Sequence, residues 1–217
     1  MLATQTQLIP LSELGAGVAA GIRNRVIQSV VAQAVKELHM TEDKLVVRDV
    51  LPRTDLALYG DTTTAATVEF WGFTTTNTTS GWLSITGAAT MADQRFVALF
   101  GIRDLGMFCG STANVTISAT TLANQGGYAQ TVSLVRFNVG GSDKVQWDAS
   151  ALRCDAQHPV MYSPSAIVFT QNVAYNISIY QPGLIAAGAM AAPLADAICR
   201  LQFVGVTVEP RGKLISP

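Results

Sequence analysis

The chain has 217 residues, of which 49% are hydrophobic and 13% charged, and its formal net charge is −1. This length allows one domain that buries about 70% of its unfolded surface, so folding needs no disulfide or metal. The charged share is about half of that usual for soluble domains, and a net charge near zero removes the repulsion that keeps copies apart. The ten arginines and four lysines are spread along the chain, which excludes a clustered phosphate-binding stripe and argues against specific nucleic-acid binding.

The first element expected in chain order is a long amphipathic helix. Apolar residues recur at four-residue steps after Ser12, which predicts a helix over residues 12–39. At 1.5 Å per residue this helix would be about 40 Å long, so it needs a partner surface. The residues of the apolar row are Leu14, Val18, Ile22, Val26, Val30 and Ala34, flanked by Ile27, Val31, Val35 and Leu38.

Small and charged residues interrupt this helix. Gly15, Gly17 and Gly21 each cost about 1 kcal/mol of helix propensity relative to alanine, so we expect the first half to order only on docking. Arg23 and Arg25 break the apolar run before it reaches the ~20 residues of a membrane span. The helix could instead lie along a membrane or an inner shell, with Arg23, Arg25 and Lys36 towards anionic lipids, although solvation of its polar face explains these charges more simply.

From about residue 44 the apolar period changes to two, which is typical of β-strands. The strands are expected at 44–50, 65–73, 82–86, 95–102, 113–119, 131–139, 166–170, 173–180 and 198–209. The apolar phase changes between Phe203 and Val204, which indicates a bulge or burial on both faces. Short strands without alternating helices predict a mainly β fold, an antiparallel two-sheet, jelly-roll-like sandwich.

The connections carry two further signals. Gly140 and Gly141 predict a tight turn between strands. Residues 181–197 form a long insertion with almost no charge, in which Leu184, Ile185 and Met190 would make an associating patch if they were exposed.

The sequence holds no recognisable catalytic apparatus. It lacks the Walker loop and the GxGxxG, GxSxG and HExxH motifs. His39 and His158 have no companion at metal or triad spacing, and the cysteines at 109, 154 and 199 are too far apart for a zinc or redox pair. We therefore expect no enzyme activity, cofactor or metal.

Two weaker functional patterns compete with this expectation. Asp49, Asp55 and Asp61 could bring carboxylates together as in a hydrolase, although pairing with Arg48 and Arg53 explains them more simply. Trp82 or Trp147 in an open cleft with Asp148 would instead indicate a carbohydrate- or ligand-binding sandwich, such as a host-recognition module.

The helical N-terminal segment, the run KLVVRDVLPRTDL, the Thr-rich β body and the terminal run LQFVGVTVEPRGKLI together resemble small jelly-roll major capsid proteins. The similar proteins come from membrane-containing icosahedral viruses, either bacteriophages or archaeal viruses. The resemblance implies an N-terminal arm, residues 1–43, and a β-sandwich domain, residues 44–217. It also implies a cofactor-free structural protein that is made in the host cytoplasm and resides in the virion.

The partners expected from this resemblance are copies of the same chain, a second capsid protein and an inner membrane reached by the N-terminal arm. The neutral, apolar surfaces favour the same partners, since they permit lateral packing. The residues predicted to contact neighbours are Leu14, Ile22, Val26, Val30 and Val31 on the arm and Leu184, Ile185 and Met190 in the insertion.

Overall fold

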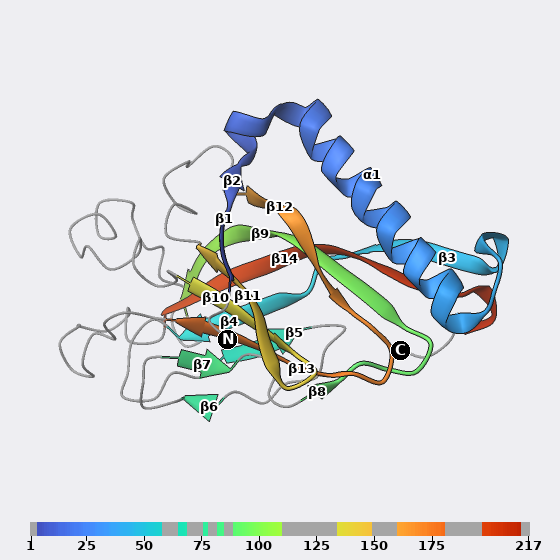
Figure 1. The fold of residues 1–217 in the computed structure, drawn as a ribbon. Coiled ribbons are helices and arrows are strands. Elements are labelled where there is room, and N and C mark those ends of the chain that lie inside the picture. Colours follow the sequence, from blue (N-terminus) through green and yellow to red (C-terminus); the bar gives the residue numbers. More distant parts are fainter. Residues whose placement is uncertain are drawn as a thin grey trace.

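The fold is mainly β, with two packed sheets and one N-terminal helix (Figure 1). The computed structural model describes residues 4–57, 65–68, 76–77, 82–84, 89–109, 134–148, 160–180 and 197–213. Sheet A has the order β1-β11-β10-β13-β7-β6, with β8 also on β13, and sheet B has the order β2-β12-β9-β14-β4-β5, with β3 also on β14.

The strands of sheet A are β1 (Thr4–Gln7), β6 (Thr76–Asn77), β7 (Trp82–Ser84), β8 (Ala89–Thr90), β10 (Leu134–Val139), β11 (Ser142–Asp148) and β13 (Ala174–Tyr180). Those of sheet B are β2 (Ile9–Pro10), β3 (Leu45–Val50), β4 (Arg53–Ala57), β5 (Ala65–Val68), β9 (Phe96–Cys109), β12 (Val160–Phe169) and β14 (Ala197–Pro210). The helix α1 spans Leu11–Leu38, and short 3₁₀ turns occupy Glu42–Lys44 and Arg211–Lys213.

The strand pairs are nested from the outside of the chain inwards. The early strands β3 and β4 pair with the last strand β14, and β7 pairs with β13. Inside them β9 pairs with β12, and β10 pairs with β11, all antiparallel. This is the order produced when one long hairpin is rolled up into two sheets, as in a jelly roll. The predicted fold class is therefore confirmed.

Helix α1 begins and ends within one residue of its predicted limits. Gly15 interrupts it with φ 70° and ψ 155°, a conformation open to glycine and costly for residues with a Cβ. The apolar row of the helix packs on the outer face of sheet B, where Ile22, Val26 and Val30 meet Phe100 and the outward residues of β14.

The central strands β9 and β14 of sheet B are consequently buried on both faces under the helix. The inner face of sheet B contacts sheet A through a core that includes Leu99, Ile102, Phe137, Trp147, Ile177 and Phe203. Its outer face lies under the helix, where Val206 and Val208 are fully buried. The apolar phase changes between Phe203 and Val204, which indicated either a bulge or burial on both faces. Both are present, because the register shifts at Val204/Gly205 and the strand is covered on two sides.

The segment before the helix closes one edge of the sandwich. Residues 4–10, the N-terminal strap, run parallel to β11 and then pair antiparallel with β12. Between these contacts Leu8 enters the core between the sheets and is 2% exposed. Thus the segment predicted as an N-terminal arm packs on the β body of its own chain over much of its length (Figure 1).

Most predicted strands are present where they fall within the described residues, with β9 and β12 longer than expected. The turn at Gly140 and Gly141 is also confirmed, since both have positive φ and Val139 pairs with Ser142 across it. The strands β1, β2, β4, β6, β8 and β11 were not predicted. The strand expected at 113–119 and the insertion at 181–196 lie outside the described residues.

We predict that Leu8→Ala lowers the free energy of unfolding by about 2–5 kcal/mol, because it leaves a cavity in the core between the sheets. Val18→Ala is the matched control, since Val18 is exposed, and we expect a change within about 0.5 kcal/mol. Guanidinium chloride unfolding of both variants measures the difference. Equal effects would contradict the docking of the strap.

Candidate interaction surface

A groove lies between the N-terminal half of α1 and the outer face of sheet B. Its volume is about 300 Å³, which is at the lower end of the range of small-molecule pockets. We call it the helix–sheet groove, and it is lined by Ala19, Ala20, Arg23, Asp49, Leu51, Phe100, Tyr162, Val204 and Gly205.

The groove exists because the helix carries small side chains where it extends past its anchored part. Ile22 is buried against the sheet, whereas Val18, one turn earlier on the same apolar row, is 51% exposed. Ala19 and Ala20 face the groove, and a Cβ added at Gly17 or Gly21 would meet nothing within 4 Å. This half of the helix is therefore loosely packed.

The floor of the groove is built from aromatic rings and strand backbone. The rings of Phe100 on β9 and Tyr162 on β12 are stacked, with centroids 6.2 Å apart and an interplanar angle of 17°. A Cβ at Gly205 would lie 2.5 Å from the carbonyl oxygen of Ala98, so only glycine lets β14 approach β9 this closely. Close strand packing at the bulge thus shapes the floor.

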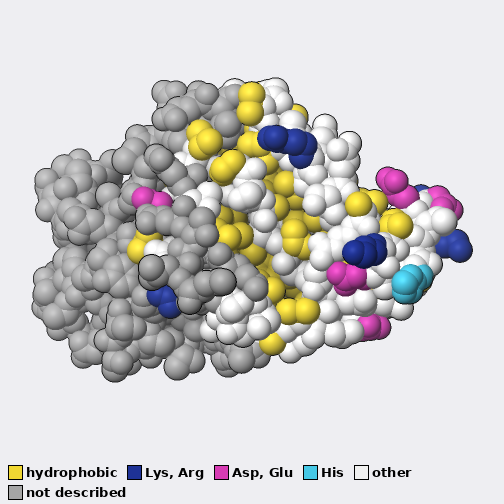
Figure 2. All heavy atoms as spheres, in the orientation of Figure 1, with side chains coloured by type: hydrophobic (Ala, Val, Ile, Leu, Met, Phe, Trp, Pro, Cys, Tyr) yellow, Lys and Arg dark blue, Asp and Glu magenta, His cyan; other side chains and the backbone are white. Residues whose placement is uncertain are grey.

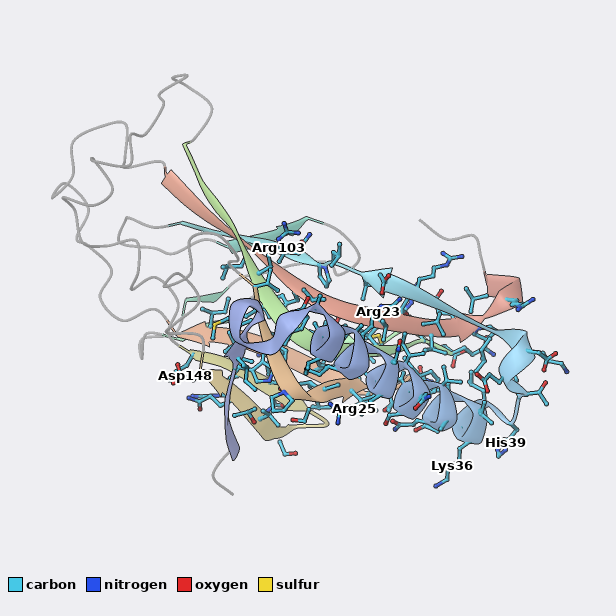
Figure 3. The ribbon with its side chains drawn as sticks, turned by 90° about the horizontal axis from the view of Figure 1, so that it is seen from above. Arg23, Arg25, Lys36, His39, Arg103 and Asp148 are labelled. Atoms are coloured by element: carbon cyan, nitrogen blue, oxygen red, sulfur yellow. The ribbon has the colours of Figure 1, made fainter. Side chains whose placement is uncertain are left out.

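An ion pair crosses one side of the groove. Arg23 Nε and Nη2 donate to Asp49 Oδ1 at 3.0 and 2.9 Å, and Nη2 also donates to Oδ2 at 3.1 Å. The side chains remain 42% and 59% exposed. Figure 3 shows Arg23 on the side of α1 towards β3 and Arg25 on the opposite side. Asp49 therefore pairs with the helix, whereas the sequence suggested Arg48 or Arg53.

Apolar side chains are exposed at the rim. Among the described residues, Val18 and Leu51 are the large hydrophobic residues that are exposed, at 51% and 42%. Leu51 lines the groove, and Val18 directly precedes two residues that line it. Figure 2 shows hydrophobic side chains gathered in a band between the helix and the β body. An exposed apolar patch with a polar rim is typical of an interaction site.

The predicted contact residues have different environments. Ile22, Val26, Val30 and Val31 are buried against sheet B of the same chain, so they could reach a neighbour only if the helix left its sheet. The side chain of Leu14 and the residues Leu184, Ile185 and Met190 lie outside the described part of the structure. Two residues that line the groove were noted in the sequence for other reasons, Arg23 as a break in the apolar run and Asp49 as a candidate carboxylate. Val18, which flanks the groove, belongs to the predicted apolar row, and the groove itself was not predicted.

The carboxylates suggested as a hydrolase pair are separated by the sheet register. Asp49 pairs with Val206 of β14 and Asp55 with Arg200 of the same strand. Six strand residues correspond to about 20 Å, too far for paired acid and base groups. Asp61 and His158 lie outside the described residues, and His39 is exposed at the end of α1. No group of three or more metal-ligating side chains occurs among the residues searched.

The proposed aromatic platform loses one of its two candidates. Trp147 is fully buried, 4.5 Å from the ring centroid of Phe137, so it cannot stack on a sugar. The error arose because Trp147 lies in the polar run SDKVQWD, yet alternation along β11 directs it inwards. Its buried Nε1 has no hydrogen-bond acceptor among the described residues.

The described part of the chain contains no helix with the length and hydropathy needed to cross a membrane. No protein-family model matches the sequence, and no curated protein is significantly similar to it. A functional inference must therefore come from the composition, the fold and the groove.

We predict that Asp49→Asn lowers the free energy of unfolding by at most about 1 kcal/mol, because exposed ion pairs contribute little to stability. Ile22→Ala is expected to cost about 2–5 kcal/mol, since it opens a cavity under the helix. Chemical denaturation of dilute protein compares them. A large loss for Asp49→Asn would instead make the ion pair a structural clamp.

Proposed function

We propose that the chain is a structural virion protein, a capsid subunit that self-assembles into an icosahedral shell. The proposal rests on the nested strand order, in which β3 and β4 pair with the last strand β14 and the middle strands β10 and β11 form the innermost hairpin. Jelly rolls of this kind serve in viral capsids, although lectins and cupins use them as well.

Composition and surface favour assembly over the other uses of this fold. With 13% charged residues and a net charge of −1, copies repel one another weakly. The exposed apolar rim of the helix–sheet groove supplies a surface whose burial would be favourable. Both properties favour lateral contacts between subunits, since a shell brings many copies of one surface together.

In the proposed assembly, the N-terminal segment would act differently from a free arm that extends onto a neighbour. Because its apolar row covers sheet B, the helix offers neighbours its exposed faces and the groove beside it. The opposite side of the helix carries Arg25 and Lys36, both exposed (Figure 3). Such charges would add about 1 kcal/mol each near an anionic inner membrane. A second capsid protein could use the same exposed faces.

We expect the full-length chain to form large species as protein concentration rises, and light scattering after size exclusion measures their absolute mass. Deleting the helix is a poor test, because deletion would expose the apolar face of sheet B. Leu51→Asp is a better variant for testing assembly than deletion of the helix, since Leu51 is 42% exposed and lies outside both cores. A clean monomer of the unaltered chain at all concentrations and salt levels would contradict the proposal.

A saccharide-binding module is the second candidate, favoured by one feature of sheet A. The register places Trp82 on β7 directly opposite Tyr180 on β13, which brings two aromatic positions together. Glycan screening of the unaltered chain and of Trp82→Ala tests this function. Binding that is lost in Trp82→Ala would favour a recognition module over a shell subunit.

A further inference from the structure

The helix–sheet groove combines an apolar hollow with protruding apolar side chains. We propose that it is a two-fold contact between two copies of this chain, in which Val18 and Leu51 of each copy enter the groove of the other. This proposal rests on the proposed function as a self-assembling subunit and names one of its contacts. The side chains that would enter the partner, Val18 and Leu51, lie outside both hydrophobic cores, so monomers can fold before they associate.

Two-fold symmetry follows from the position of the hollow and the protrusions in one patch. In an isologous contact, residue i touches residue j of the partner and j touches i. Leu51 lines the groove and Val18 directly precedes its helical wall, so the patch contains both complementary shapes. The small side chains of Ala19 and Ala20 leave the opening that a partner's valine or leucine would enter.

The charges of the patch on one copy are complementary to those of the same patch on a second copy. Arg23 and Asp49 are adjacent and partly exposed, so a two-fold axis near them brings each guanidinium beside the partner's carboxylate. Because the pair is neutral, two such patches attract at short range without repelling on approach. A guanidinium has five N–H donors, so Arg23 can keep its own Asp49 and still donate to a second carboxylate.

Other occupants fit the patch less well. An anionic membrane would meet the carboxylate of Asp49 beside Arg23 and gain little from the neutral pair. An apolar small molecule would fill the hollow but leave the protruding Val18 and Leu51 in water. A second copy buries the hollow and both protrusions at once.

Complementary charge variants separate contacts within a chain from contacts between chains. Arg23→Glu places two like charges together within one copy, and Asp49→Lys does the same with the opposite sign. If the charges meet only within a chain, mixing the two variants changes nothing. In a two-fold contact the mixed pair places Glu beside the introduced lysine and the remaining Asp49 beside the remaining Arg23, so both contacts become attractive.

Sedimentation equilibrium of each variant and of their equimolar mixture is the measurement. We expect each variant alone to self-associate at least about tenfold more weakly than the unaltered chain, because like charges oppose in the contact. The mixture should regain association to within about threefold. Lys36→Glu, at the far end of α1 (Figure 3), is the charge-matched control and should associate normally.

Leu51→Asp and Val18→Asp test the apolar part with unchanged circular dichroism as the folding check. The contact is supported if the unaltered chain forms dimers, each single variant loses them, and the mixture of Arg23→Glu and Asp49→Lys restores them. This holds even if no larger shell forms. Large particles that persist in every variant overturn the two-fold contact but leave the shell function standing. A monomeric unaltered chain overturns both proposals, and a mixture as weak as its components overturns the contact.

Discussion

The strands β9 and β14 must be buried on both faces, and this requirement determines where sheet A and α1 pack. The central strand β14 has apolar residues in both directions, which would leave a large hydrophobic surface in water if either side were open. Sheet A covers one face and α1 the other. The helix thus covers an apolar face of the sandwich, and its inward row packs within its own chain.

The packing of α1 on its own sheet explains where a surface for other molecules can form. The anchored part of the helix, from Ile22 onwards, has no apolar side left to offer, whereas the preceding turn overhangs the sheet. There the small residues produce the helix–sheet groove, and the apolar row continues to an exposed valine. A bidentate but half-exposed ion pair holds the helix to β3 at this point without closing the groove.

The local sequence pattern was sufficient to predict the helix and the strands, but insufficient to predict what they pack against. The four-residue row predicted α1, and strict alternation predicted β13, because both periods reflect one buried face. Neither period indicates what covers that face, so the sequence did not reveal that the row packs on sheet B of its own chain. Its contact with a neighbouring subunit stays a prediction. The pairing of Arg23 with Asp49 joins residues 26 positions apart and left no trace in local spacing.

The missed strands have a common reason. The strap TQTQLIP and the run SDKVQWD are short and mostly polar, and they become strands because an edge is available for them to pair with. Leu8 is buried in a core whose other buried members, apart from Val50, lie more than 80 positions away in the chain. Trp147 looked accessible for the same reason, since its polar neighbours concealed the inward direction of its position.

If the helix–sheet groove is a contact between copies, association must protect the backbone that lines it. Hydrogen–deuterium exchange at low and high protein concentration measures that protection. At high concentration, we expect slower exchange of backbone amides at residues 16–23 of α1 and at residues 49–51, at the end of β3, with residues 30–38 unchanged. Exchange at 16–23 and 49–51 that stays the same across a concentration range in which the mass rises would contradict this contact, because association would then use another surface.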